Sequence, residues 1–229
     1  MCGPILRSVG RAAIEIVVAS IVVAAGLVVA ALVWRRRAPD LPIALLEQGL
    51  RSDAAQVQRT ILRLAHEVVE RHPGLDGVVL VGIRTRGVPL AQRLARALAG
   101  MGLSEPQVAG LDARDYRDDR PRRDNGKVRA LMALDGGTLP RIDSANVVVV
   151  DDVVFTGRTL RAGLDALVAE GRPAAVEALV LVDRGHRELP LKATYVGKNV
   201  PTAVGDRVSV RLREVDGVDG AWLLQGARV

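Results

Sequence analysis

Apolar residues form two alternating patterns along the chain, short continuous runs and sets with helical spacing. The runs cover residues 78–81, 147–150 and 176–182. Such runs are typical of strands that are buried on both faces of a sheet. Between them, apolar positions three and four residues apart predict helices at about 88–99 and 160–170. This alternation of strand and helix predicts an α/β fold with a mostly parallel central sheet.

A further helix is predicted before these units. Ser52 and Asp53 supply its start, because their side chains accept hydrogen bonds from the first free N–H groups of a helix. Apolar residues then recur at helical spacing until Pro73 and Gly74 end the pattern. The opposite face of this helix is polar and carries Arg59, Arg63, His66 and Glu70.

The loops that follow the three predicted strands are expected to meet at one site. In open parallel sheets, ligands bind beyond the carboxyl ends of the strands, so the loops after Val81, Val150 and Val182 should converge. The stretch 116–140 is rich in Arg, Asp and Gly. Its length and composition predict a mobile loop of the kind that closes over a ligand.

The first forty residues differ from the rest of the chain. Residues 16–34 are uncharged and mostly apolar, and this length can span most of a bilayer core of about 30 Å. Three arginines at 35–37 favour placing the following chain in the cytoplasm. The predicted organisation is an extension at 1–40 with a transmembrane helix, followed by a cytoplasmic domain at 41–229.

Two alternatives to a membrane anchor stay open. A cleaved signal peptide fits less well, because the apolar run is long and no A-x-A cleavage site follows it. A start site set too far upstream would remove the segment from the natural product. Membrane anchoring is therefore expected only if the extension is genuine.

Composition limits the function without naming it. The formal net charge is +6, and three of these charges lie in the first forty residues. The remaining domain is modestly basic, which excludes a protein that coats nucleic acid. The single cysteine, Cys2, excludes an internal disulfide, and the three histidines lack zinc-ligand spacing. We expect a reducing compartment and no metal held by protein ligands alone.

Residues 147–159, VVVVDDVVFTGRT, carry the clearest chemistry. A buried strand delivers Asp151 and Asp152 to its carboxyl end, and ionised carboxylates accept hydrogen bonds from vicinal ribose hydroxyls. Neighbouring side chains on a strand point to opposite sides, so the pair is not expected to act as one chelate. The segment 156–159 then opens a helix, whose free N–H groups favour a phosphate. Together they predict a ribose 5-phosphate site, although the acid pair alone would favour an ordinary strand end followed by a Thr helix cap.

In these residues the sequence resembles the type I phosphoribosyltransferases, which bind 5-phosphoribosyl 1-diphosphate (PRPP) with such a motif. Four more segments narrow the resemblance to the PyrR family, and they are VLVGIRTRG at 79–87, YRDD at 116–119, VDRGHRELP at 182–190 and YVGKNVPT at 195–202. The match covers roughly residues 54 to 224. It implies the type I phosphoribosyltransferase fold, a central mostly parallel sheet flanked by helices with a small hood.

The resemblance also assigns the site residues. It implies diphosphate binding by Gly82, Arg84, Thr85, Arg86 and Gly87. It implies ribose and 5-phosphate binding by Asp151, Asp152, Val153, Val154, Phe155, Thr156, Gly157, Arg158 and Thr159. Catalytic roles fall on Asp151, Asp152 and Arg117, and base recognition in the hood falls on Asp183 and Arg184. Which of the two carboxylates acts as a base is left open.

For activity, the resemblance implies transfer of phosphoribosyl from PRPP to uracil, giving UMP and diphosphate. Mg²⁺ is the implied cofactor, held mainly by substrate and waters. The family also implies regulation of the pyrimidine operon through uridine-nucleotide-dependent binding of its mRNA leader, and a homodimer or higher homo-oligomer. The RNA-binding candidates are Arg59, Arg63, His66, Arg71, Arg187 and Lys198.

Two other functions stay open at this point. A type I transferase could act on orotate or a purine, because base specificity depends on the geometry of the hood. The protein could also be a non-catalytic regulator that senses PRPP or nucleotides and binds RNA. An amphipathic helix commonly carries charges on its solvated face, so the basic residues of the first helix do not decide for RNA.

Overall fold

The computed structural model describes residues 51–118, 130–134 and 136–224. The chain divides into two units, residues 1–44 and 45–229, and every element named below belongs to the second. The predicted extension at 1–40 and its apolar segment lie outside the described residues. Within the described ranges, no helix is long and apolar enough to cross a membrane.

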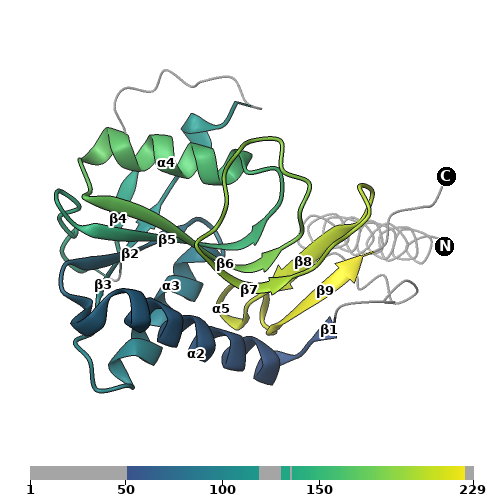
Figure 1. The fold of residues 1–229 in the computed structure, drawn as a ribbon, viewed down its shortest axis with the longest axis horizontal. Coiled ribbons are helices and arrows are strands. Elements are labelled where there is room, and N and C mark those ends of the chain that lie inside the picture. Colours follow the sequence, from purple (N-terminus) through teal and green to yellow (C-terminus); the bar gives the residue numbers. More distant parts are fainter. Residues whose placement is uncertain (1–50, 119–129, 135, 225–229) are drawn as a thin grey trace, which may run out of the picture. The chain divides into compact units, whose positions relative to one another are not determined.

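A six-stranded sheet forms the centre of the domain (Figure 1). Its strands follow the order β4-β3-β2-β5-β6-β7, and all neighbours are parallel except β3 and β4. This arrangement confirms the mostly parallel sheet that the sequence predicts. The strands are β2 (Val78–Ile83), β3 (Gln107–Leu111), β4 (Leu131–Ala133), β5 (Asn146–Val154), β6 (Ala175–Asp183) and β7 (Tyr195–Asn199).

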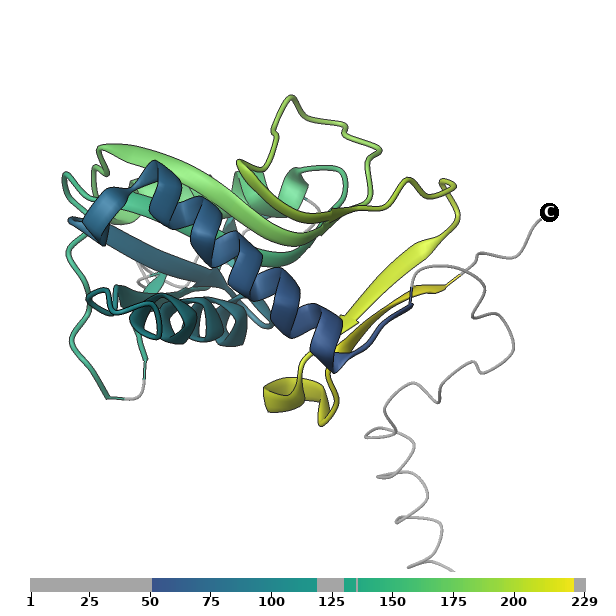
Figure 2. The same cartoon turned by 60° about the horizontal axis from the view of Figure 1, so that its bottom comes forward.

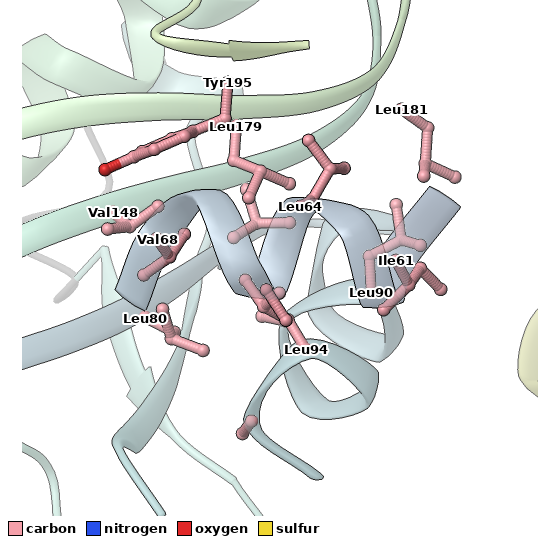
Figure 3. Close-up of a cluster of buried hydrophobic side chains, with 14 of the residues drawn as sticks. Ile61, Leu64, Val68, Leu80, Leu90, Leu94, Val148, Leu179, Leu181 and Tyr195 are labelled. Atoms are coloured by element: carbon pink, nitrogen blue, oxygen red, sulfur yellow. The ribbon is translucent and has the colours of Figure 1, made fainter. Parts of the chain in front are cut away.

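Helices cover both faces of this sheet. Helices α2 (Ala54–Arg71) and α3 (Gly87–Ala99) pack on one face, and α4 (Arg158–Glu170) packs on the other (Figure 1). Because successive side chains of a strand point to opposite faces, Leu80 and Val148 meet α2 and α3, whereas Val81 and Val149 meet α4. Figure 3 shows the first of these two cores.

The start of α2 is fixed by local hydrogen bonds. The Asp53 carboxylate accepts from the N–H of Gln56 at 2.8 Å, and the Gln56 side chain accepts from the N–H of Asp53 at 3.2 Å. This reciprocal pair is a capping box, which satisfies two N–H groups at the helix start. The predicted boundary of the helix is therefore confirmed.

A smaller antiparallel sheet contains both ends of the described domain (Figure 2). Its order is β1-β9-β8, with β1 (Arg51–Ser52), β8 (Arg207–Arg211) and β9 (Gly220–Leu224). The short helix α5 (Arg213–Asp216) connects β8 to β9. Two 3₁₀ turns, η1 (Pro73–Leu75) and η2 (Arg114–Tyr116), complete the elements.

Two predicted boundaries are wrong. The stretch 116–140 contains strand β4 as well as loop, and β4 pairs antiparallel with β3 through Leu111 and Leu131; its residues 119–129 and 135 lie outside the described residues. Strand β5 runs on to Val154 rather than ending at Val150, because Val153 pairs with Val182 on β6. Three-residue strands and polar strand ends carry no apolar run that the sequence pattern could reveal.

Candidate active site

The predicted site residues gather at the carboxyl ends of the central strands. From β2 the chain passes to β3 on one side, and β5 later joins β2 on the other side. Such a reversal is the topological switch point at which open α/β sheets bind ligands. Strands β2, β5 and β6 are neighbours and parallel, so the loops after Val81, Val150 and Val182 share one edge of the sheet, as predicted.

The diphosphate loop, residues 82–87, joins β2 to α3 and is packed against β5. A Cβ added to Gly87 would lie 2.2 Å from the carbonyl oxygen of Val150, and one added to Gly82 would lie 2.5 Å from the carbonyl oxygen of Gly87. Only glycine fits such close backbone approaches. Thr85 is exposed in the loop, and the Arg84–Thr85 peptide bond is cis.

Arginine side chains surround this loop. The Arg84 side chain is exposed. The main-chain N–H of Arg84 donates to the carbonyl of Leu111 at 3.0 Å, which connects the loop to the end of β3. Arg86 is half-buried and donates to both carboxylate oxygens of Asp216, at 3.0 and 2.7 Å. Asp112, which follows β3, pairs with Arg114, and this hydrogen bond lowers the pKa of Asp112.

The acid pair lies within β5. The N–H of Asp152 donates to Oδ1 of Asp151 at 2.9 Å, and the N–H of Val153 donates to Oδ1 of Asp152 at 2.9 Å. Burial raises the pKa of Asp151 well above its usual value, and the charge of Asp152 raises it further. Burial also raises the pKa of Asp152, against the attraction of Arg86. The sequence predicts side chains on opposite sides of the strand, yet the two carboxyls are close enough for the charge of one to act on the pKa of the other.

Arg117 acts on this pair from the segment after η2. Its charge lowers the pKa of Asp151, against the larger effect of burial. Arg117 is only partly exposed, although it belongs to a segment that the sequence predicts as a loop. The predicted catalytic residues Asp151, Asp152 and Arg117 therefore interact electrostatically.

The phosphate loop, residues 156–159, leads from β5 into α4. Gly157 has φ of 90°, a left-handed conformation that glycine adopts at little cost, and stands at the N-cap of α4. The N–H of Arg158 lies 3.4 Å from Oγ1 of Thr156. Free N–H groups at the start of a 13-residue helix suit a phosphate. The Arg158 side chain turns elsewhere and pairs with Asp118 and with Glu188, the latter at 2.7 Å.

The loop at 184–191 folds over the phosphate loop and is fastened by Arg187. The N–H groups of Glu188 and Leu189 donate to the carbonyl of Thr156 at 3.0 and 3.2 Å. Arg187 donates to the carbonyls of Phe155, Gly185 and Leu191 and to the carboxylate of Asp183. Its guanidinium is thus engaged inside the fold, which leaves it few donors for the RNA contact that the resemblance implies.

Arg184 is the one charged side chain among the described residues that is buried, with 6% of its surface exposed. Its guanidinium lies 3.8 Å from the ring centroid of Phe155, a cation–π contact. Nε and Nη2 are buried without a hydrogen-bond partner in the described part of the chain. Burial lowers the pKa of Arg184. Buried unpaired donors are costly in a folded protein, so their presence here points to a ligand with an acceptor group.

The remaining RNA-binding candidates lie on α2 and on β7, the edge strand of the sheet. Arg59 and His66 are exposed on α2, and Lys198 is exposed on β7. Arg63 pairs with Glu67 and donates to the main-chain carbonyls of the edge strand β7, and Arg71 donates to Glu177 at 2.5 Å. Arg63 and Arg71 are exposed as well, but the guanidinium groups of Arg63, Arg71 and Arg187 are engaged within the fold, which distinguishes them from Arg59, His66 and Lys198.

Known proteins are similar to this chain in sequence and in fold. The model of the phosphoribosyl transferase domain family matches residues 53–211. The "Bifunctional protein PyrR" of Chloroflexus aurantiacus is 52% identical over 175 residues, which cover 76% of this chain and 93% of that protein. The chain belongs to the PyrR family. Its relative in Ligilactobacillus salivarius is 48% identical and the match covers 75% of this chain and 95% of that protein.

Solved structures support the fold of this PyrR family member. A hypoxanthine phosphoribosyltransferase of Staphylococcus aureus superposes with a TM-score of 0.57 at 18% identity, covering 82% of this chain and 97% of that one. One from Trypanosoma cruzi has a TM-score of 0.58 at 23% identity, covering 79% and 92%. At these identities the likeness concerns the fold, which is that of the type I phosphoribosyltransferases.

Two residues beside the PyrR family site have no signal in the sequence pattern. Asp112 follows strand β3, whose five residues, QVAGL, contain no long apolar run. Asp216 lies 130 residues after Arg86 in a short polar helix, so no local spacing connects them. Both become visible once the sheet order brings the ends of distant segments together.

Proposed function

We propose that this protein transfers the phosphoribosyl group of PRPP to uracil, giving UMP and diphosphate. The observation that carries the proposal is the juxtaposition of Asp151 and Asp152 with the free start of α4, beside the diphosphate loop at the switch point of the sheet. The family, whose curated members are named bifunctional, supports it.

The residues suggest how the reaction proceeds. The backbone of 156–159 holds the 5-phosphate, the acid pair accepts hydrogen bonds from the ribose hydroxyls, and the loop 82–87 with Arg86 receives the diphosphate. Loss of diphosphate from the anomeric carbon builds positive charge on the ribose, which the nearby carboxylates stabilise. Uracil N1 then bonds to that carbon, its proton passing to a base such as Asp151 or Asp152.

A magnesium ion fits this set of residues. Two carboxyls with raised pKa values offer oxygen ligands that a cation would help to ionise. Among the described residues, no group of three or more His, Cys, Asp or Glu side chains is arranged around a metal. The fit is therefore to Mg²⁺ shared with substrate and water, which neutralises charge on the leaving diphosphate when bound.

The test is a coupled assay with uracil, orotate and purine bases competing for PRPP. We expect turnover of uracil to give UMP, with no product from the other bases. If orotate or a purine is converted and uracil is not, that base is the substrate in place of uracil. No turnover with any base would overturn the proposed enzyme activity and leave a regulator that senses nucleotides as the function.

Arg184 supports a place for the base. Its two unpaired donors would bind a carbonyl oxygen of uracil, and Phe155 fixes the guanidinium plane. We expect Arg184→Leu to raise KM for uracil roughly ten- to hundredfold with little change in KM for PRPP, because the charged hydrogen bonds to the base are lost. Stability to urea should not fall, since the wild-type donors are unpaired. Arg207→Leu, which removes a nearby exposed charge, is the matched control, and an equal effect there would contradict the assignment.

We also propose that the protein binds the mRNA leader of the pyrimidine operon in a uridine-nucleotide-dependent manner. Arg59 and His66 form an exposed basic face on α2, with Lys198 on the neighbouring strand β7 as a further candidate. Phosphate contacts of this kind give salt-dependent affinity. A homo-oligomer would combine two such faces.

The RNA proposal predicts a specific loss in a titration of labelled leader RNA. Arg59→Ala should weaken binding and reduce the slope of log K against log salt by about one, because one phosphate contact is removed. Arg63→Ala is a less clean test, since its guanidinium also binds the carbonyls of β7. Arg172→Ala, an exposed arginine before β6, is the control. Affinity that is indifferent to UMP and to Arg59→Ala would contradict RNA regulation.

Membrane anchoring through residues 16–34 stays a prediction from hydropathy. Fractionation of the natural protein tests it, together with the amino-terminal mass that shows whether residues 1–40 are present. Recovery of the full-length chain with membranes is the expected result if the extension is genuine.

A further inference from the structure

Two arginines of α3 connect the diphosphate loop to the turn between β8 and β9. Arg86, at the start of α3, pairs with Asp216 at the end of α5. Two turns later, Arg93 pairs with Glu214 at 2.8 and 2.5 Å and with Asp219 at 2.6 Å. The two links join the same elements, but only Arg86 belongs to the loop that receives diphosphate.

The pairing fixes the orientation of the Arg86 guanidinium. Nε donates to Oδ2 of Asp216 at 3.0 Å and Nη2 donates to Oδ1 at 2.7 Å, so the carboxylate occupies one side of the planar group. This leaves both N–H groups of Nη1 and the second N–H of Nη2 for another acceptor. The Arg86 side chain keeps 36% of its surface exposed, and its charge acts on Asp152 of the acid pair.

Asp216 is itself held in place. Its Oδ2 accepts from the N–H of Leu212 at 2.9 Å, and its own N–H donates to the carbonyl of Leu212 at 2.7 Å. The side chain is 17% exposed. The hydrogen bond from Arg86 lowers the pKa of Asp216, so the carboxylate stays ionised at neutral pH. A fixed, charged carboxylate leaves the guanidinium little freedom to rotate.

We propose that Asp216 is a positioning residue that holds Arg86 with its free edge available to the diphosphate of PRPP. The inference rests on the proposed function of the loop 82–87. A guanidinium already oriented binds a diphosphate without losing its rotational freedom at that moment. Asp216 therefore acts on the leaving group through Arg86 and touches no substrate itself.

The test is Asp216→Asn, which keeps the size of the side chain and an acceptor for Leu212 but removes the charge that orients Arg86. We expect KM for PRPP and the inhibition constant of diphosphate to rise about tenfold, because an oriented charged contact is lost. KM for uracil should stay unchanged. Glu214→Gln is the matched control, since it weakens the second link between α3 and α5 without touching the loop.

Three outcomes would overturn the proposal. The first is a rise in KM for PRPP in Glu214→Gln as large as that in Asp216→Asn, which would make the effect structural. A lower KM for PRPP in Asp216→Asn would mean that Asp216 competes with diphosphate for Arg86. A further tenfold rise when Asp216→Asn is added to Arg86→Ala would show that Asp216 does not act through Arg86.

Direct binding separates this proposal from the proposed function. Calorimetric titration of Mg²⁺–PRPP and Mg²⁺–diphosphate into the wild-type protein and the same variants requires no turnover. If the wild type converts no nucleobase, the proposed enzyme fails, while tenfold weaker diphosphate binding by Asp216→Asn still supports positioning. Equal binding by the wild type and Asp216→Asn would overturn positioning even if the enzyme is active.

Discussion

Asp152→Asn should reduce the turnover of uracil and PRPP by at least about a hundredfold, because the carboxylate lies where positive charge builds on the ribose. Asn keeps the side-chain oxygen that accepts from the N–H of Val153, so the local backbone should stay intact. Steady-state kinetics with varied PRPP measure the loss. Asp76→Asn, which removes an exposed carboxylate before β2 at the end of the strand opposite the site, is the matched control.

The same variant should be at least as stable as the wild type at neutral pH. Burial raises the pKa of Asp152 in the folded protein above its unfolded value, so the ionised carboxyl costs stability there. This cost is absent below the unfolded pKa of about 4, grows as pH rises from there, and is complete above the folded pKa. Urea unfolding at several pH values should show the advantage of Asp152→Asn shrinking toward acid. Wild-type turnover in Asp152→Asn would contradict its role at the ribose, whatever the stability.

Activity should depend on pH through the same coupled pair. The pKa of Asp151 is raised by burial and by the charge of Asp152, so one proton is retained to higher pH than for a free aspartate. Ribose hydroxyls and Mg²⁺ favour the ionised form. We therefore expect kcat/KM for PRPP to rise with pH as this proton is lost, and the rise to change in Asp152→Asn, which removes one member of the pair.

The strands and helices that have a clear apolar pattern could be predicted from the sequence. Strands β2, β5 and β6 are buried on both faces and contain continuous apolar runs, and α3 and α4 show clear helical spacing. Strands β4, β8 and β9 could not be predicted. They are short or partly exposed, and pairing with distant segments, not a local pattern, makes them strands.

In the candidate site, too, the local features could be predicted from the sequence and the long-range contacts could not. The motif residues at 82–87 and 151–159 are consecutive in the chain, so the order of residues alone indicates their chemistry. The links from Arg86 to Asp216 and from Arg158 to Glu188 join residues 130 and 30 positions apart. Such contacts depend on sheet order and loop packing, which local spacing does not encode. Arg187 illustrates the difference. The family resemblance makes it a candidate for RNA binding, whereas in the structure its guanidinium donates to four acceptors and holds the loop at 184–191 in place.

Gly87→Ala should lower the free energy of unfolding by about 1–3 kcal/mol, the range in which overpacked substitutions typically fall. The added Cβ would lie 2.2 Å from the carbonyl oxygen of Val150, and both sides of this contact are backbone. Relief therefore requires the start of α3 to move away from β5. Urea denaturation followed by circular dichroism measures the loss of stability.

The displacement in Gly87→Ala should also reach the diphosphate loop, since Arg86 is the neighbouring residue and the N-cap of α3. We expect KM for PRPP to rise in the fraction that remains folded, while KM for uracil changes less. Gly205→Ala is the control, because a Cβ there would meet nothing within 4 Å and its backbone is not in the left-handed region. That substitution should leave stability unchanged or raise it by up to about 1 kcal/mol through the unfolded state. Equal stability of Gly87→Ala and Gly205→Ala would show that the loop does not rest on β5 as closely as the 2.2 Å approach requires.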